Sequence, residues 1–432
     1  MLSAIVRAFR TPDLRNKLAF TLAIVAIYRL GSFIPAPLVN YGNVQKCLAQ
    51  TQNTSGLYEL VNLFSGGALL QLSIFALGIM PYITSSIIVQ LLTVVIPRFE
   101  ALKQEGQSGT AKLTQYTRYL TIGLGILQAT GLIAVARTPG NLFRSCNLAI
   151  IPDASWQRIA TMVFVMTAGT AVIMWLGELI TDRGIGNGMS ILIFTSIAAG
   201  FPGQLWSIKV QKGWPVFLFV MAIGVVIVAA VVFVENAQRR IPVQYAKRMV
   251  GRQMYGGTST YIPIKVNQAG VIPVIFASSL LYIPNLIVNL TGSKAAWATF
   301  ISKFFVRGDH WSYMLAYFLL IIFFTYFYVS ITFNPDEVAE NMKKYGGFIP
   351  GIRAGRPTSE YLAYILSRIT APGALYLGFV ALIPIIALSL FGATQNFPFG
   401  GTAILIVVGV GLDTAKQIES QLQQRSYEGF LR

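Results

Sequence analysis

The sequence predicts an all-α polytopic membrane protein with about ten transmembrane helices in two inverted five-helix halves. Three observations predict this class. The 432 residues are 54% hydrophobic and only 11% charged, the apolar residues fall in helix-length runs, and one helix pattern recurs half a chain later. Soluble domains carry roughly 25% charged residues. The composition therefore excludes a soluble enzyme, and it also excludes a disordered chain, which needs the opposite composition.

Apolar runs bounded by charged residues mark the spans, because a helix needs about 20 mostly apolar residues to cross a bilayer. The fifth and tenth runs are short, and glycines precede both. Prolines interrupt the second run at Pro81 and the ninth at Pro372 and Pro384. Proline kinks are tolerated where neighbouring helices cover the freed carbonyls, so these two helices are expected to face protein. The ten predicted spans are residues 18–34, 69–96, 119–136, 159–177, 188–201, 215–234, 270–290, 312–333, 362–391 and 401–415.

The distribution of lysine and arginine predicts the orientation. Of the 33 basic residues, 23 lie on the side that carries both termini, and cytoplasmic loops are enriched in lysine and arginine. Both termini are therefore expected in the cytoplasm. The predicted segments are a cytoplasmic N-terminal segment (1–17), a first half (18–201), a second half (202–415) with cytoplasmic loops 235–269 and 334–361, and a cytoplasmic tail (416–432).

The two long basic loops have two interpretations. They either follow the orientation rule alone, or they form a docking surface for something acidic or rich in phosphate. On the opposite side, Cys47 and Cys146 fall in predicted extracytoplasmic loops. They could pair as a disulfide or remain two free thiols.

The second and seventh spans share a sequence pattern. IMPYITSS (79–86) and IPVIFASS (272–279) place their prolines, Pro81 and Pro273, 192 positions apart. The two helices are five spans apart, an odd number, so they cross in opposite directions. Inverted repeats of this kind put the functional site at their interface near the midplane. The alternative is chance, because proline and serine are ordinary in membrane helices.

Motifs for enzymatic chemistry are missing from the sequence. A single histidine, His310, rules out HExxH, and neither GxSxG nor GxxxxGK[ST] occurs. The 16 acidic residues lie in loops or at span ends, with Glu178 and Asp413 nearest the interior. Ion-coupled transporters usually keep an ionisable group inside the membrane. The sequence therefore favours a passive pore with no enzymatic activity, no cofactor and no metal.

Several long motifs closely resemble the SecY family of bacterial proteins, and the match runs from about residue 10 to 430. The resemblance implies a central pore, a plug and a lateral gate. It implies a protein-conducting channel of the bacterial cytoplasmic membrane that passes unfolded polypeptides and signal sequences and releases transmembrane segments into lipid. The implied partners are the SecE and SecG subunits, the SecA motor and the ribosome. The motifs are 62–92 (NLFSGGALLQLSIFALGIMPYITSSIIVQLL), 175–194 (WLGELITDRGIGNGMSILIF), 267–279 (NQAGVIPVIFASS), 346–358 (GGFIPGIRAGRPT) and 399–414 (FGGTAILIVVGVGLDT).

The resemblance also implies four sets of site residues. The pore ring is expected from Ile79, Ile83, Met189, Ile193, Ile275 and Ile406. The plug is expected in 57–71, including Asn62, Phe64, Ser65, Gly66 and Gly67. The lateral gate is expected from Thr84, Ser85, Ser86, Gln90, Gln128, Ser278, Ser279 and Asn285. Partner binding is expected from Arg239, Arg240, Lys247, Arg248, Arg353 and Arg356.

Each set has a physical rationale and a plainer alternative. Branched apolar side chains form a narrow ring that dewets, although isoleucines in membrane helices usually face lipid or pack helices. Met189 stands where relatives carry isoleucine. Gly66 and Gly67 each lower helix stability by about 1 kcal/mol relative to alanine, as a displaceable stopper requires. Polar side chains between membrane helices pair weakly, by about 0.6 kcal/mol each, but serine and threonine also bond to their own helix. Arginine suits bidentate binding to carboxylate or phosphate, whereas a basic loop is otherwise simply solvated.

Two other functions fit the composition. A secondary transporter would share the inverted repeat, and an insertase or assembly scaffold without a pore would share the spans. Ion conductance separates these functions from a channel.

Overall fold

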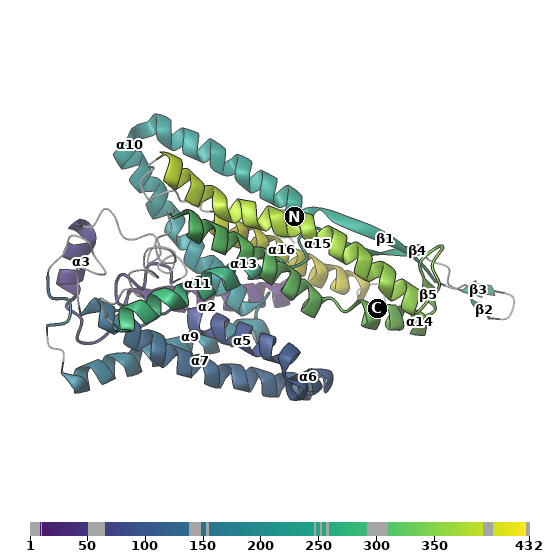
Figure 1. Ribbon diagram of the computed structural model, residues 1–432, viewed down its shortest axis with the longest axis horizontal. Coiled ribbons are helices and arrows are strands. Elements are labelled where there is room, and N and C mark those ends of the chain that lie inside the picture. Colours follow the sequence, from purple (N-terminus) through teal and green to yellow (C-terminus); the bar gives the residue numbers. More distant parts are fainter. Residues whose placement is uncertain are drawn as a thin grey trace.

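The computed structural model describes residues 9, 11–50, 65–137, 148–152, 155–245, 248–250, 253–255, 259–291, 310–391 and 401–428. Most helices lie along the long axis of the molecule (Figure 1). Helix α3 lies at one end, called here the α3 end, and the strands, α6 and α14 lie at the other, called here the strand end (Figure 1). The helices of the first part of the chain are α2 (Pro12–Phe33), α3 (Tyr41–Gln50), α5 (Met80–Val95), α6 (Pro97–Gln104), α7 (Gln107–Ala136), α9 (Trp156–Arg183) and α10 (Gly188–Asn236). Those of the remainder are α11 (Ile272–Thr291), α13 (Trp311–Thr332), α14 (Pro335–Lys344), α15 (Arg356–Phe391) and α16 (Gly401–Glu428).

The predicted fold class, a helical membrane protein with many spans, is confirmed, and each of the ten predicted spans coincides at least in part with a helix. Five helical segments of the described chain are long and apolar enough to cross a membrane by length and composition. A sixth is the pair α5 and α6 if the two form one span, although they meet at a bend of 100°. Two further apolar helices, Gly188–Gly203 and Ile272–Leu281, are shorter than a comfortable crossing.

The second predicted span, residues 69–96, is helical only in its second part. Residues 65–79 form a succession of turns, and α5 begins at Met80 with Pro81 in its first turn. The expectation that Pro81 kinks a long helix was therefore wrong. Proline at the first helical positions loses no hydrogen bond, because the N–H there has no partner within the helix.

Helix α10 combines the fifth and sixth predicted spans. It bends at Gly213, whose φ of 81° is open to glycine but costly for other residues. Pro202 and Pro215 flank this bend. A chain that turns back here presents two antiparallel helical arms to the rest of the molecule, as Figure 1 shows for α10.

The two long basic loops are folded rather than extended polar loops, which the sequence reasoning did not foresee. Strands β1 (Gln238–Tyr245), β4 (Ser259–Lys265) and β5 (Gly347–Phe348) form an antiparallel sheet in the order β4-β1-β5. Strands β2 (Arg248–Val250) and β3 (Gln253–Tyr255) form a separate pair. In β1, Ile241 and Val243 point inward at alternate positions, the period of a half-buried strand.

Four apolar clusters hold these elements together, and the smallest consists of Leu14 of α2, Ile418 of α16 and Ile185, with the side chains around them. A central cluster joins α2, α5, α9, α10, α11, α13, α15 and α16. A second lies toward the α3 end, and a third packs the sheet against α14 and α15. Large apolar side chains also remain on the outside, such as Leu315, Leu319 and Phe323 of α13. Lipid covers such side chains in a membrane protein, so their exposure fits helices that span a bilayer.

Candidate functional site

The expected pore ring is brought together in the central apolar cluster. Five of the six expected residues are buried members of that cluster. They are Ile79, which directly precedes α5, Ile83 of α5, Ile193 of α10, Ile275 of α11 and Ile406 of α16. These positions lie up to 327 residues apart in the chain, counted from Ile79 to Ile406. A branched apolar side chain is stiff and offers water no hydrogen bond. Because these side chains converge, the centre of the molecule is apolar, and the four helices α5, α10, α11 and α16 contribute to it.

Met189 differs from the other expected ring residues. It packs against the cluster, but its sulfur lies against Gly177 of α9, in the space that a Cβ on Gly177 would occupy. Gly188, beside it, also packs closely against α9, because a Cβ built on Gly188 would clash with the Gly177 carbonyl oxygen. The side chain of Met189 therefore fills a notch between α9 and α10.

The described part of the expected plug is buried except at Gly66, Gly67 and Gln71, which are partly buried. Ser65, Ala68 and Leu69 are at most 2% exposed, and the Ser65 hydroxyl accepts a hydrogen bond from the Leu69 N–H at 3.0 Å. Gly66 and Gly67 adopt positive φ angles of 67° and 91°. These residues form turns rather than a helix. The remaining expected plug residues, Asn62 and Phe64, lie outside the described residues.

Helix α11 contacts both α5 and α7, which is the seam expected for the lateral gate. Three of the expected gate hydroxyls bond back to their own helices: Thr84 to the Met80 carbonyl, Ser85 to the Pro81 carbonyl and Ser278 to the Ile275 carbonyl. The plainer alternative therefore holds for these three residues.

The other expected gate residues vary in exposure. Ser279 is 6% exposed, and its hydroxyl has no hydrogen-bond partner in the described structure. Ser86 and Gln128 are partly buried, and Gln90 is exposed. Asn285 belongs to α11, but its side chain lies outside the described part. Because few of these side chains form hydrogen bonds across the seam, separating its helices requires breaking few polar contacts.

The expected partner-binding arginines lie at the strand end. Arg239 and Arg240 are exposed on β1, and the Arg240 guanidinium lies over the Tyr261 ring at 4.8 Å. Arg353 is exposed between β5 and α15, and its carbonyl accepts a hydrogen bond from the Thr358 hydroxyl at 2.8 Å. Arg356 instead pairs with Glu360, with 3.0 Å between Nε and Oε1. Lys247 lies outside the described residues, and Arg248 belongs to β2.

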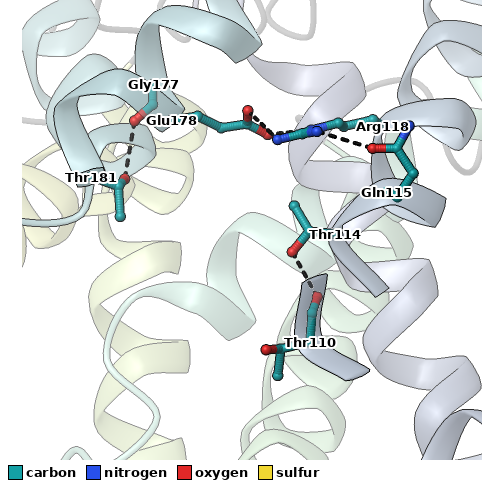
Figure 2. Close-up of polar contacts among 7 residues, drawn as sticks. All are labelled: Thr110, Thr114, Gln115, Arg118, Gly177, Glu178 and Thr181. Carbon is teal, nitrogen blue, oxygen red and sulfur yellow. Dashed lines mark hydrogen bonds and ion pairs between the residues drawn. The ribbon is translucent and has the colours of Figure 1, made fainter. Parts of the chain in front are cut away.

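Two polar contacts join segments that lie far apart in the sequence. Arg118 of α7 grips Glu178 of α9 with two hydrogen bonds of 2.8 and 2.7 Å, while Gln115 accepts a third from Arg118 at 3.0 Å (Figure 2). A second contact joins Glu235 of α10, which is only 8% exposed, to the Asn267 amide at 2.7 Å. Sequence reasoning placed Glu178 and Asp413 nearest the interior and missed the burial of Glu235. The signal available was an acidic residue directly after the apolar run 215–234.

No group of three or more histidine, cysteine, aspartate or glutamate side chains that could hold a metal ion occurs among the described residues. The centre of the molecule offers packing surface rather than reactive groups. Such a surface is suited to packing around other groups and to excluding water.

The fold and the site define a helical membrane protein with a central apolar cluster and a stretch of turns packed between α2 and α10. The chain belongs to the SecY family, because residues 73–415 match the SecY family. It is 68% identical over 438 residues to the protein translocase subunit SecY of Streptomyces galbus, and the match covers 100% of both chains.

Solved structures of low sequence identity share the fold. One is a SecY channel whose plug domain is described as stabilising the closed state and maintaining a membrane seal, with a TM-score of 0.64 and 18% identity over 94% of this chain and 91% of that one. Another is Sec61 in the canine ribosome-channel complex from the endoplasmic reticulum, with a TM-score of 0.61 and 18% identity over the same shares.

Proposed function

We propose that this chain is the pore-forming subunit of a protein-conducting channel that passes unfolded polypeptides across the membrane and releases transmembrane segments sideways into lipid. The observation that carries the proposal is the convergence of Ile79, Ile83, Ile193, Ile275 and Ile406 in one buried cluster. Such a ring excludes water and ions when closed. It would also fit around a passing chain without binding it, because apolar side chains hold no fixed polar partner. Lateral release would use the seam between α11 and the helices α5 and α7.

We infer that the membrane is the bacterial cytoplasmic membrane and that both termini are cytoplasmic. The basic arginines of β1 and of the loop before α15 lie at the strand end, and cytoplasmic segments are enriched in such residues. Cys47 of α3, toward the other end, is buried and disulfide-bonded, and disulfides persist in oxidising compartments. The chain's other cysteine, Cys146, lies outside the described residues.

The proposed partners are SecE and SecG as companion subunits, and SecA or a ribosome as the source of energy. The sequence contains no phosphate-binding GxxxxGK[ST] motif, so the driving force has to come from another molecule. Exposed arginines at the strand end suit acidic or phosphate-rich partners. No catalytic role is proposed for this chain.

A transporter or an insertase scaffold without a pore is the competing function. The buried ring and the buried turns beside it favour a channel, since a scaffold needs neither. Conductance in planar bilayers separates these functions. A channel freed of its plug passes ions, whereas a scaffold does not conduct whichever segment is removed.

Deleting residues 60–68 is expected to leave a folded channel that leaks small ions and admits poorer signal sequences. The reason is that the deletion removes Ser65 and Ala68, which are fully buried, and Gly66 and Gly67, which are partly buried, from the proposed plug. Ion flux from vesicles containing the purified protein measures the leak. A deletion variant as tight as the parent would count against any plug in this chain.

Disulfides engineered across the seam between α11 and α5 or α7 are expected to block export of transmembrane segments. The positions to scan are Ser86 and Gln128 on one side and Ser278 and Ser279 on the other, in several pairings. A control pair at Phe318 and Gly378 joins α13 to α15, where the phenylalanine ring already fills the space beside the glycine. If the control pair and every seam pair crosslink without any loss of export, the gate lies elsewhere.

A further inference from the structure

Arg29 is a charged side chain inside a helix of the membrane fold. It belongs to α2, four residues before the helix ends at Phe33. Its Nη1 donates a hydrogen bond of 2.9 Å to the carbonyl of Gly66, and its guanidinium lies over the Phe33 ring at 5.2 Å. Within the described part of the chain, no carboxylate pairs with it. An ionisable side chain on a helix of a membrane protein is uncommon, and it is by default a candidate for a functional role.

The acceptor of this bond lies in a tightly confined turn. Gly66 has a φ of 67°, and a Cβ built on it would lie 2.8 Å from Nη1 of Arg29 and 3.3 Å from Cα of Ser196. The turn is therefore wedged between α2 and α10. Only glycine fits this conformation and this space without strain.

The contact lies close to the apolar ring. Ser196 follows the ring residue Ile193 by three positions, about one helical turn along α10. The Ser196 hydroxyl lies 2.6 Å from the Tyr28 hydroxyl, so α2 and α10 are joined at this level. The backbone turn at Gly66 therefore lies about one helical turn of α10 away from the proposed constriction.

The following part of the same segment is attached to the α2 region through backbone hydrogen bonds and through the Phe75 ring, which stacks on Tyr28 with 6.0 Å between the ring centroids. The Ile74 N–H donates to the Ile34 carbonyl and the Ala36 N–H donates to the Leu72 carbonyl, both at 2.9 Å. These bonds tie residues 72–74 to the end of α2. Nearer the Gly66 turn, the Arg29 side chain is a further attachment to α2, and it can rotate away while the backbone bonds persist.

We propose that Arg29 is a positioning residue that holds the turn at 65–68 beside the constriction in the resting channel. This inference rests on the proposed plug. A hydrogen bond from a charged donor is stronger than one between neutral groups, so it holds the turn firmly. Release of the turn from α2 has to break this hydrogen bond, whereas the cation–π contact of the guanidinium with the Phe33 ring can persist.

The test is the ion leak of the purified channel complex in lipid vesicles. Arg29→Gln is expected to raise the leak about tenfold, because it removes a hydrogen bond from a charged group. Arg29→Lys keeps the charge and one donor, so it should restore part of the tightness. Arg137→Gln is the matched control, because Arg137 is an exposed arginine just after α7. The control should be as tight as the parent.

A second measurement follows the turn itself. A cysteine at Ala68, which is fully buried, should resist a membrane-impermeant alkylating reagent in the parent and react several-fold faster with Arg29→Gln. Gly66→Ala loosens the same contact from the other side, since its Cβ would meet Nη1 at 2.8 Å. This variant should leak as well, and it keeps the test valid if Arg29→Gln fails to fold.

Combination with the 60–68 deletion separates this inference from the proposed plug. If Arg29 acts through the turn, adding Arg29→Gln to the deletion should not increase the leak further. A leak that adds to that of the deletion would overturn the inference, and so would tight Arg29→Gln and Gly66→Ala channels beside a leaky deletion. A tight deletion variant would instead remove the plug from the proposed function.

Discussion

Asparagine at Ile83, Ile275 or Ile406 is expected to raise the resting ion leak and to relax signal-sequence stringency while the protein still folds. Each of these side chains is at most 9% exposed and lies in the central cluster. An amide buried there without a partner costs about 1–3 kcal/mol, so the closed ring loses stability relative to a hydrated opening. A shift of this size changes the open population by roughly tenfold or more. Single-channel conductance and export of a substrate with a defective signal sequence measure the two effects.

Two control variants separate the ring from general core damage. Ile321→Asn places the same amide in the same cluster at a fully buried position on α13, outside the expected ring. It should lower stability without raising the leak. Ile275→Leu keeps the ring apolar and should remain tight. Parental conductance and stringency in all three asparagine variants would place the constriction on other residues.

Arg353→Glu is expected to stop translocation while the protein still inserts into the membrane at its normal level. Arg353 is exposed in the loop between β5 and α15, where Gly351 and Gly355 adopt positive φ angles of 85° and 105°. Its exposed position leaves the guanidinium accessible to a partner. Charge-assisted hydrogen bonds contribute about 1.5–3 kcal/mol to binding. Replacing the positive charge of Arg353 by a negative one therefore weakens partner binding by at least about tenfold. Secretion in cells that depend on the variant measures the effect.

Arg356→Glu is the matched control for Arg353→Glu. Arg356 lies three residues further on and is also exposed, but it pairs with Glu360. Its reversal should reduce secretion far less. Arg353→Lys should be intermediate, because lysine copies bidentate binding poorly. Unchanged secretion with Arg353→Glu would remove this residue from partner binding.

The positions of the membrane helices could be predicted from the sequence, because the length of an apolar run is what a bilayer selects. Residues 119–136, for example, fall within the single helix α7, and residues 312–333 match α13 except for their last residue. The ring residues could be named only through the family resemblance. Isoleucine is common in every span, and no local pattern says which isoleucines converge. The structure then brings five of them into one cluster, while Met189 turns toward Gly177.

Other features depended on contacts between distant segments. Residues 65–79 are apolar enough for a helix, yet they form turns that bond to the end of α2 through the Leu72 and Ile74 backbone. Strand β1 is stabilised by β4 and by the apolar cluster beneath it, and its alternating Ile241 and Val243 were the only local signal. The roles of Arg29 and Glu235 arise from partners at Gly66 and Asn267, which lie 37 and 32 residues away in the chain.

The proposed path of the polypeptide through the ring can be tested most directly by crosslinking a stalled translocating chain. A photoreactive residue would replace Ile275 or Ile406 in the ring, and Leu319 would serve as the control because it is 55% exposed on the outer face of α13. The account predicts strong crosslinks from the two ring positions to the stalled polypeptide and none from position 319. Equal crosslinking at all three positions, or crosslinks from position 319 alone, would contradict it.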